Sequence, residues 1–194
     1  MTNVEKKWFD QYSGAFENIK RYWGAYGGRS AVLRSPYFHA AVLLLLVTWN
    51  SWSQPKWWEQ VISVMPNLLG FTLGGFAIFI GFGDEKFRAI LAEPDEDKNK
   101  PTIYVSLCAA FVHFILIQLA ALIYAIIVGS LHFYVPWPTF VEKLIPYLNL
   151  LSGSVGFCLF LYALTSLAAV TMHVFRIAHL YSVHQRFRQS DTTD

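Results

Sequence analysis

The chain has 194 residues, of which 55% are hydrophobic and only 14% are charged. Soluble globular domains carry about 25% charged residues, so this composition argues against a soluble fold. The net charge of +2, without a basic stripe, argues against direct nucleic-acid binding. Cys108 and Cys158 lie within apolar runs, which excludes a disulfide framework or a cysteine zinc site.

Residues 4–27 are predicted to form an amphipathic helix. Aromatic and aliphatic side chains recur at spacings of three and four residues, and charged side chains take the other side. Such a helix can lie in the cytoplasmic membrane interface, or it can pack on a sister subunit or a soluble partner. Both alternatives stay open, with Trp8, Tyr12 and Phe16 among the contact residues. Gly27 and Gly28 are expected to end the helix.

Long apolar runs predict an all-α integral membrane protein with a bundle of four transmembrane helices, at residues 37–52, 61–82, 103–129 and 148–175. No run contains Lys, Arg, Asp or Glu in its interior. The first run is short, but a cluster of tryptophans is expected to meet the headgroups at its far end: Trp49, Trp52, Trp57 and Trp58. The predicted organisation is an N-terminal segment 1–35, a membrane domain 36–176 and a tail 177–194.

The distribution of Lys and Arg predicts that both termini face the cytoplasm. Thirteen of these residues lie in the N-terminal segment, the connection between the second and third runs, and the tail. The other two connections hold one each, Lys56 and Lys143. Because cytoplasmic segments are enriched in Lys and Arg, the 84–101 loop is expected on the same side as the termini.

The second run carries a continuous stripe of small residues. In lipid, helices associate through close van der Waals contact and hydrogen bonds, which small residues permit. The stripe therefore predicts a face for helix packing, for homo-oligomerisation, or for both, and the fourth run repeats it more weakly. The residues assigned to these faces are Ser63, Asn67, Gly70, Gly74, Ala77, Gly81, Ser152 and Gly156. In the third run, His113 and Gln118 are expected to form hydrogen bonds between helices.

The charged sequence after the second run is predicted to continue that helix into the cytoplasm for about two turns, until Pro94 breaks it. It is either a solvated connector or a docking surface for a cytosolic protein. The docking residues would be Asp84, Glu85, Lys86 and Arg88.

Two further functions depend on particular residues. The strip Ile80–Asp84 resembles the selectivity filter of potassium channels, in which backbone carbonyls replace the ion's hydration shell. Phe79 stands where that family has threonine, so a glycine-rich helix end is the preferred interpretation, with an oligomeric ion channel as the alternative. His39 and His173 could share a depth and ligate a haem, which makes an electron carrier the second alternative.

Catalysis is not predicted. Intramembrane enzymes need carboxylates, a nucleophile–base pair or metal ligands facing one cavity, and the interiors of the apolar runs hold no acidic residue. Proton-coupled transport is disfavoured for the same reason. No catalytic residue, metal ion or cofactor is therefore assigned, and a non-enzymatic anchor, sensor or scaffold is favoured.

In size, in its four runs, in its aromatic N-terminus and in the DEKFR extension of a glycine-rich second run, the chain resembles the transmembrane component of the Kiwa bacterial anti-phage system. The resemblance covers the whole chain and rests on its architecture. It implies a homo-oligomer, a tetramer among the stoichiometries considered, in the bacterial inner membrane. It also implies a cytosolic, DNA-associated protein partner and a role in sensing phage infection at the envelope.

Overall fold

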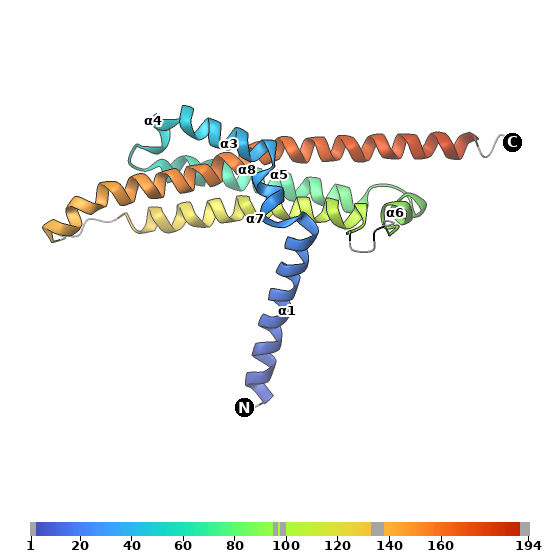
Figure 1. The fold of residues 1–194 in the computed structure, drawn as a ribbon, viewed down its shortest axis with the longest axis horizontal. Helices are drawn as coiled ribbons and strands as arrows, with labels where there is room; N and C mark the ends of the chain where they lie inside the picture. Colours follow the sequence, from blue (N-terminus) through green and yellow to red (C-terminus); the bar gives the residue numbers. More distant parts are fainter. Residues whose placement is uncertain (1–2, 95–96, 98–99, 133–137, 191–194) are drawn as a thin grey trace.

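The computed structural model describes residues 3–94, 97, 100–132 and 138–190, and their regular structure is entirely helical. Three of the helices are long and apolar enough to cross a membrane: α5 (Trp57–Gly81), α7 (Ile103–Ser130) and α8 (Thr139–Ser190). They lie side by side in an elongated bundle, and α3 runs along α8 (Figure 1). The remaining helices are α1 (Asn3–Tyr26), α2 (Gly28–Leu33), α3 (Pro36–Val47), α4 (Trp49–Trp52) and α6 (Glu85–Leu91). The fold is that of an all-α membrane protein.

The first apolar run does not form one continuous helix. α3 ends at Val47, and the backbone turns at Thr48 before α4 begins. Twelve helical residues at about 1.5 Å each reach about 18 Å, which is less than the hydrocarbon thickness of about 30 Å. Trp52 Nε1 donates to the carbonyl of Leu45 at 2.8 Å, which ties α4 to the end of α3. The fourth crossing therefore remains a prediction.

α8 is a single helix of 52 residues with Pro146 inside it. It begins nine residues before the predicted start at Leu148 and ends fifteen residues after the predicted end at Phe175. The predicted span ended where polar residues appear in the sequence, because a change from apolar to polar residues marks the edge of a bilayer. The backbone need not break at that edge, and α8 extends beyond the other helices (Figure 1).

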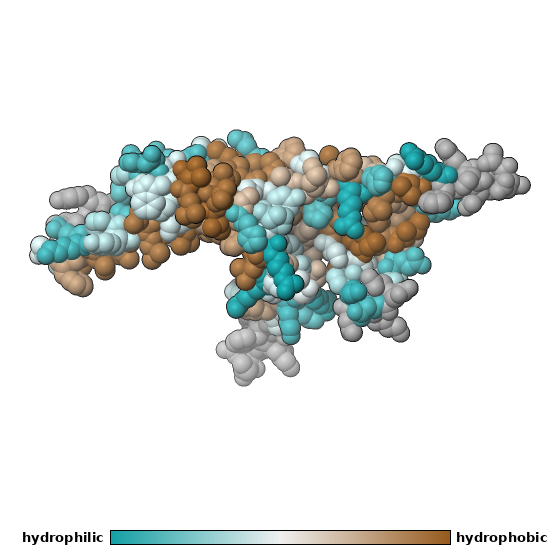
Figure 2. Space-filling view, turned by 45° about the horizontal axis from the view of Figure 1, so that its top comes forward, coloured by the Kyte–Doolittle hydropathy of each residue, from teal (hydrophilic) through white to brown (hydrophobic). Residues whose placement is uncertain are grey.

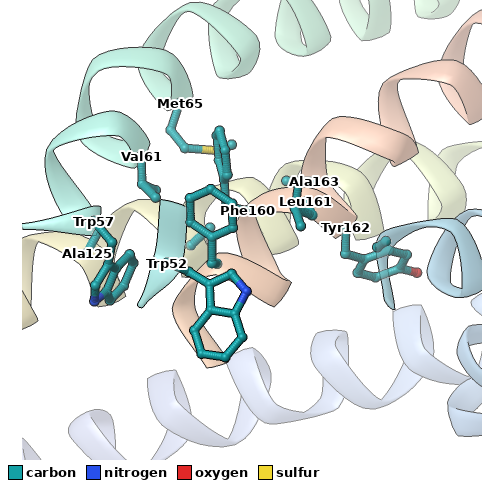
Figure 3. Close-up of a cluster of buried hydrophobic side chains, with 12 residues drawn as sticks. Trp52, Trp57, Val61, Met65, Ala125, Phe160, Leu161, Tyr162 and Ala163 are labelled. Atoms are coloured by element: carbon teal, nitrogen blue, oxygen red, sulfur yellow. The ribbon is translucent and has the colours of Figure 1, made fainter. Parts of the chain in front are cut away.

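One buried core lies at the α4 end of the bundle. Trp52 and Trp57, which were predicted to lie among headgroups, are each only 6% exposed and pack inside the protein. Figure 3 shows the Trp52 ring next to Phe160 of α8 and the Trp57 ring next to Ala125 of α7, in one cluster. Gly153 and Gly156 of α8 make room for them, because a Cβ at Gly156 would lie 2.0 Å from the Trp57 ring. These two side chains therefore pack within the protein instead of facing outward, whereas Trp49 is exposed. The position of the tryptophan cluster relative to the headgroups stays a prediction.

A second core lies at the opposite end and holds α6 against the bundle. Phe79 of α5 stacks on Phe111 of α7 with ring centroids 5.5 Å apart. Phe87 and Leu91 of α6 are buried in the same cluster, together with Ile177 of α8. These contacts set where the charged residues of α6 are presented.

Candidate functional site at the bases of α1 and α6

The side of the bundle holds α1 through a cluster of three tyrosines and a histidine. His113 of α7 is only 2% exposed. Its Nδ1 lies 2.7 Å from Tyr22 Oη of α1, and its Nε2 lies 3.0 Å from Tyr162 Oη of α8. A neutral imidazole donates from one nitrogen and accepts at the other, so one hydroxyl donates and the other accepts. Tyr22, Tyr26, His113 and Tyr162 form what we call the tyrosine–histidine cluster.

Ring stacking strengthens this attachment. The Tyr26 ring lies on His113 with centroids 3.8 Å apart and an interplanar angle of 17°. Partial burial raises the pKa of Tyr22 to about 12, and burial likewise raises the pKa of Tyr26. Both phenols therefore stay protonated at physiological pH and keep their capacity to donate. The cluster joins α1, α7 and α8 through its side chains. Of these residues, only His113 was predicted from the sequence to form hydrogen bonds between helices.

The hydrogen-bonding prediction for α7 is confirmed at both residues. Besides the bonds of His113, Gln118 Nε2 donates to Thr72 Oγ1 of α5 at 2.9 Å. Both Gln118 and Thr72 are fully buried. In an apolar interior such bonds fix how two helices face each other, because an unpaired polar group is costly there.

The free part of α1 leaves the bundle at a steep angle to its long axis (Figure 1). Tyr12, Phe16 and Ile19 are exposed in a row along it. On another side of the helix, Arg21 donates to Glu17 at 2.5 Å. The predicted contact residues Tyr12 and Phe16 are therefore accessible, and the side chain of Trp8 lies outside the described residues.

The strip that resembles a channel filter forms a helix end and a turn. α5 ends at Gly81, Phe82 is extended, and Gly83 has a φ of +84°, which glycine adopts without strain. Asp84 then caps α6, because Phe87 N–H donates to its Oδ1 at 2.8 Å. The prediction that α5 continues past the membrane was wrong, since this turn ends it and α6 begins as a separate helix.

This turn divides the predicted docking residues into two kinds. Asp84 is partly buried and holds the start of α6, whereas Glu85, Lys86 and Arg88 are exposed. Phe87 faces inward, with its ring centroid 5.0 Å from that of Tyr181.

Because Asp84 caps the start of α6, substituting alanine for Asp84 is expected to destabilise α6 by about 1 kcal/mol. Amide exchange of α6 should rise in Asp84→Ala but not in Glu85→Gln, and equal exchange in both would contradict the assignment.

An open notch lies between the base of α1 and the connection from α6 to α7. Its volume is about 630 Å³, and its charged lining residues are Glu17, Lys20, Arg21 and Lys100. Glu17 pairs with Arg21, so Lys20 and Lys100 leave the lining with an excess of positive charge. Figure 2 shows hydrophilic side chains gathered around α1 against the largely hydrophobic bundle. The notch, called the cationic notch below, thus combines two segments that the sequence assigned to one side of the membrane.

The small-residue stripe of α5 faces away from the rest of the protein. All its members are exposed, from Ser63, Asn67, Gly70 and Gly74 to Ala77 and Gly81. A Cβ built on Gly70 or Gly74 would meet nothing within 4 Å. The weaker stripe of α8 lies inside, where Ser152 Oγ is 3.1 Å from Tyr124 Oη and Gly156 packs under Trp57.

The two histidines considered for a haem have separate surroundings. His39 is exposed and its Nε2 lies 2.8 Å from the carbonyl oxygen of Leu33. The ring of His173 lies 6.1 Å from that of Phe114. Within the described part of the chain, no group of three or more His, Cys, Asp or Glu could hold a metal ion.

These features together offer surfaces for association, because charged and small residues are presented outward while the buried polar groups hold helices together. Comparison with known proteins adds no further guide: no protein-family model, curated protein or solved structure matches the chain.

Proposed function

We propose that the protein is a non-enzymatic membrane scaffold that self-associates and binds an acidic segment of a cytosolic protein in the cationic notch. One observation carries this proposal: α1 and the α6–α7 connection meet at a single notch with an excess of positive charge. Lys20, Arg21 and Lys100 come from two segments far apart in the sequence. Complementary charge gives a partner both orientation and fast association.

The exposed stripe of α5 supports self-association. Small residues on a membrane helix let a second helix approach closely. A Cβ built on Gly70, Gly74 or Gly81 of the stripe would meet nothing within 4 Å. An oligomer would bring several notches together, so a partner with repeated acidic segments would bind more tightly than to one copy.

The resemblance to the Kiwa membrane component supports a more specific role. It suggests the bacterial inner membrane, with both termini cytoplasmic, and a DNA-associated effector as the partner. In this role the oligomer is a sensor that responds to phage infection and holds its effector at the membrane. The exposed charges of α6 would offer a second contact surface, formed by Glu85, Lys86 and Arg88.

The notch proposal is tested by reversing its charges. We expect the pair Lys20→Glu and Lys100→Glu to reduce recovery of the partner at least about tenfold, since two attractions become repulsions. Recovery is measured by gentle detergent extraction from the native host and quantitative mass spectrometry. Lys143, an exposed lysine of α8, lies outside the notch, so Lys143→Glu should leave recovery of the partner unchanged. Equal recovery of the partner with the wild type, the double variant and Lys143→Glu would contradict the proposal.

The association proposal is tested on the stripe. The pair Gly70→Leu and Gly74→Leu is expected to convert the oligomer to monomer, because two bulky side chains prevent close approach. Native mass spectrometry gives the distribution of oligomers. Gly14→Leu is the matched control, because this glycine of α1 also has open space around it. An unchanged distribution of oligomers in the Gly70→Leu, Gly74→Leu double variant would show that the copies associate through another surface.

A further inference from the structure

We propose that the cytoplasmic surface of the bilayer crosses the bundle at the level of the tyrosine–histidine cluster. The exposed apolar row of α1 then rests on lipid, and the adjoining ends of α5, α7 and α8 stand in the cytoplasm. The predicted orientation is needed only to call this surface of the bilayer cytoplasmic. The position itself follows from where α1 is attached and from which of its residues are charged.

Several contacts define one cross-section of the bundle at this level. The cluster joins the base of α1 to α7 and α8. Thr165 of α8 donates to the carbonyl of Tyr37 at 2.9 Å, which places the start of α3 beside it. Phe76 of α5 lies beside Phe111 of α7, with ring centroids 5.4 Å apart. α1 therefore cannot change its depth without breaking the cluster.

The charges next to this level exclude a deep position. Glu17, Lys20 and Arg21 are exposed on α1, and Arg29 and Arg34 are exposed before α3. A bilayer that reached the start of α7 would place the cluster about 15 Å below its surface, since ten residues separate Ile103 from His113. Each exposed charge at such a depth costs about 2.5–3.5 kcal/mol or more. Glu17 and Arg21 form an ion pair, and the charges of Lys20, Arg29 and Arg34 still make that placement untenable.

The lengths on the other side of the cluster fit one hydrocarbon layer. The part of α7 from His113 to its end at Ser130 is about 27 Å long, and the part of α5 from Trp57 to Phe76 is about 30 Å long. A typical hydrocarbon core is about 30 Å thick. Exposed Trp49 lies at the far end, where interfacial tryptophans are common.

The two faces of α1 suit the two sides of such a surface. Tyr12, Phe16, Ile19 and Trp23 follow one another at spacings of four, three and four residues and form one exposed apolar row. Lys20 and Arg21 lie on another face and line the cationic notch, toward the α6 end of the bundle. The row matches a lipid interface, and the notch opens to the cytosol.

The part beyond the surface exposes apolar side chains that lipid would not cover. Ile78 of α5 and Val174 and Phe175 of α8 are all exposed there. The small-residue stripe continues into this part through Ala77 and Gly81. A second copy would cover these side chains, and this step rests on the proposed self-association. In water their burial adds a hydrophobic contribution that helices surrounded by lipid lack.

Spin labels at three positions test the placement. Phe16, Ala168 and Val155 are each replaced by cysteine in a Cys108→Ala, Cys158→Ala background, and all three positions are exposed. The labelled full-length protein is placed in vesicles of phosphatidylcholine with phosphatidylglycerol. Collision with oxygen, which concentrates in lipid, is compared with collision with a water-soluble nickel chelate. Val155 is the matched control for Ala168 on the same helix.

We expect the label at Phe16 within about 10 Å of the headgroups on the lipid side. The label at Ala168 should collide mainly with nickel, and that at Val155 mainly with oxygen. The predicted span 148–175 would put Ala168 in the hydrocarbon, whereas the proposed placement puts it beyond Thr165 and outside the bilayer. A label at Ala168 that is exposed to hydrocarbon would therefore overturn the proposal. A label at Phe16 in the bilayer centre, or in bulk water, would overturn it as well.

Discussion

Replacing His113 with leucine should release α1 from the bundle. The change removes the partner of two tyrosine hydroxyls and the polar ring on which Tyr26 stacks. Each hydrogen bond contributes about 0.5–1.5 kcal/mol, and a buried hydroxyl left unpaired costs about 1–3 kcal/mol. Undocking should therefore become about 10-fold to 1,000-fold more frequent, since 1.4 kcal/mol corresponds to a factor of ten. The measurement is hydrogen–deuterium exchange of α1 in lipid nanodiscs.

Two variants make this result specific. His39→Leu removes an exposed histidine whose ring contacts the carbonyl of Leu33, and it should leave α1 exchange unchanged. Tyr22→Phe removes one bond of the cluster and keeps the Tyr26 stack, so its exchange should lie between the wild type and His113→Leu. Slow exchange of α1 in His113→Leu would show that something other than the cluster holds this helix.

Replacing Gly153 with alanine is expected to destabilise the bundle by about 3 kcal/mol. The added Cβ would lie 2.4 Å from the backbone oxygen of Trp52, and backbone cannot move aside as a flexible side chain does. Overpacking a close-packed core costs about 1–3 kcal/mol, and a backbone clash belongs at the upper end of that range. Thermal unfolding followed by tryptophan fluorescence should show a clearly lower midpoint.

The matched control is Gly75→Ala on α5, a glycine outside the small-residue stripe. A Cβ there would meet nothing within 4 Å, and alanine forms helix better than glycine by about 1 kcal/mol. The same substitution should therefore leave stability unchanged or raise it. Equal midpoints for both variants would show that Gly153 and Trp52 are not packed as described.

The sequence predicted the helical class and much of the internal hydrogen bonding, because both depend on local patterns. α7 agrees with its predicted run within one residue, since an apolar run without breakers defines a helix by itself. His113 and Gln118 stood out because polar side chains in such a run need partners. Nothing local identified those partners, since Tyr22 and Tyr162 lie 91 and 49 residues from His113.

Hydropathy also could not show where the backbone turns. The break at Thr48 lies within apolar sequence, and the capped turn at Asp84 lies where a charged helical extension was expected. The cationic notch depends on the angle at which α1 is attached, and the tyrosine–histidine cluster sets that angle. Composition marks which residues leave the membrane, whereas tertiary contacts decide where they meet.

Native mass spectrometry of the protein, gently extracted from its host, tests the scaffold proposal most directly. The chain has a mass of 22.2 kDa. We expect a homo-oligomer of a single stoichiometry that carries a soluble protein, which is lost when Lys20 and Lys100 are both changed to glutamate. An oligomer without a partner, or a partner that remains bound after these changes, would contradict the account.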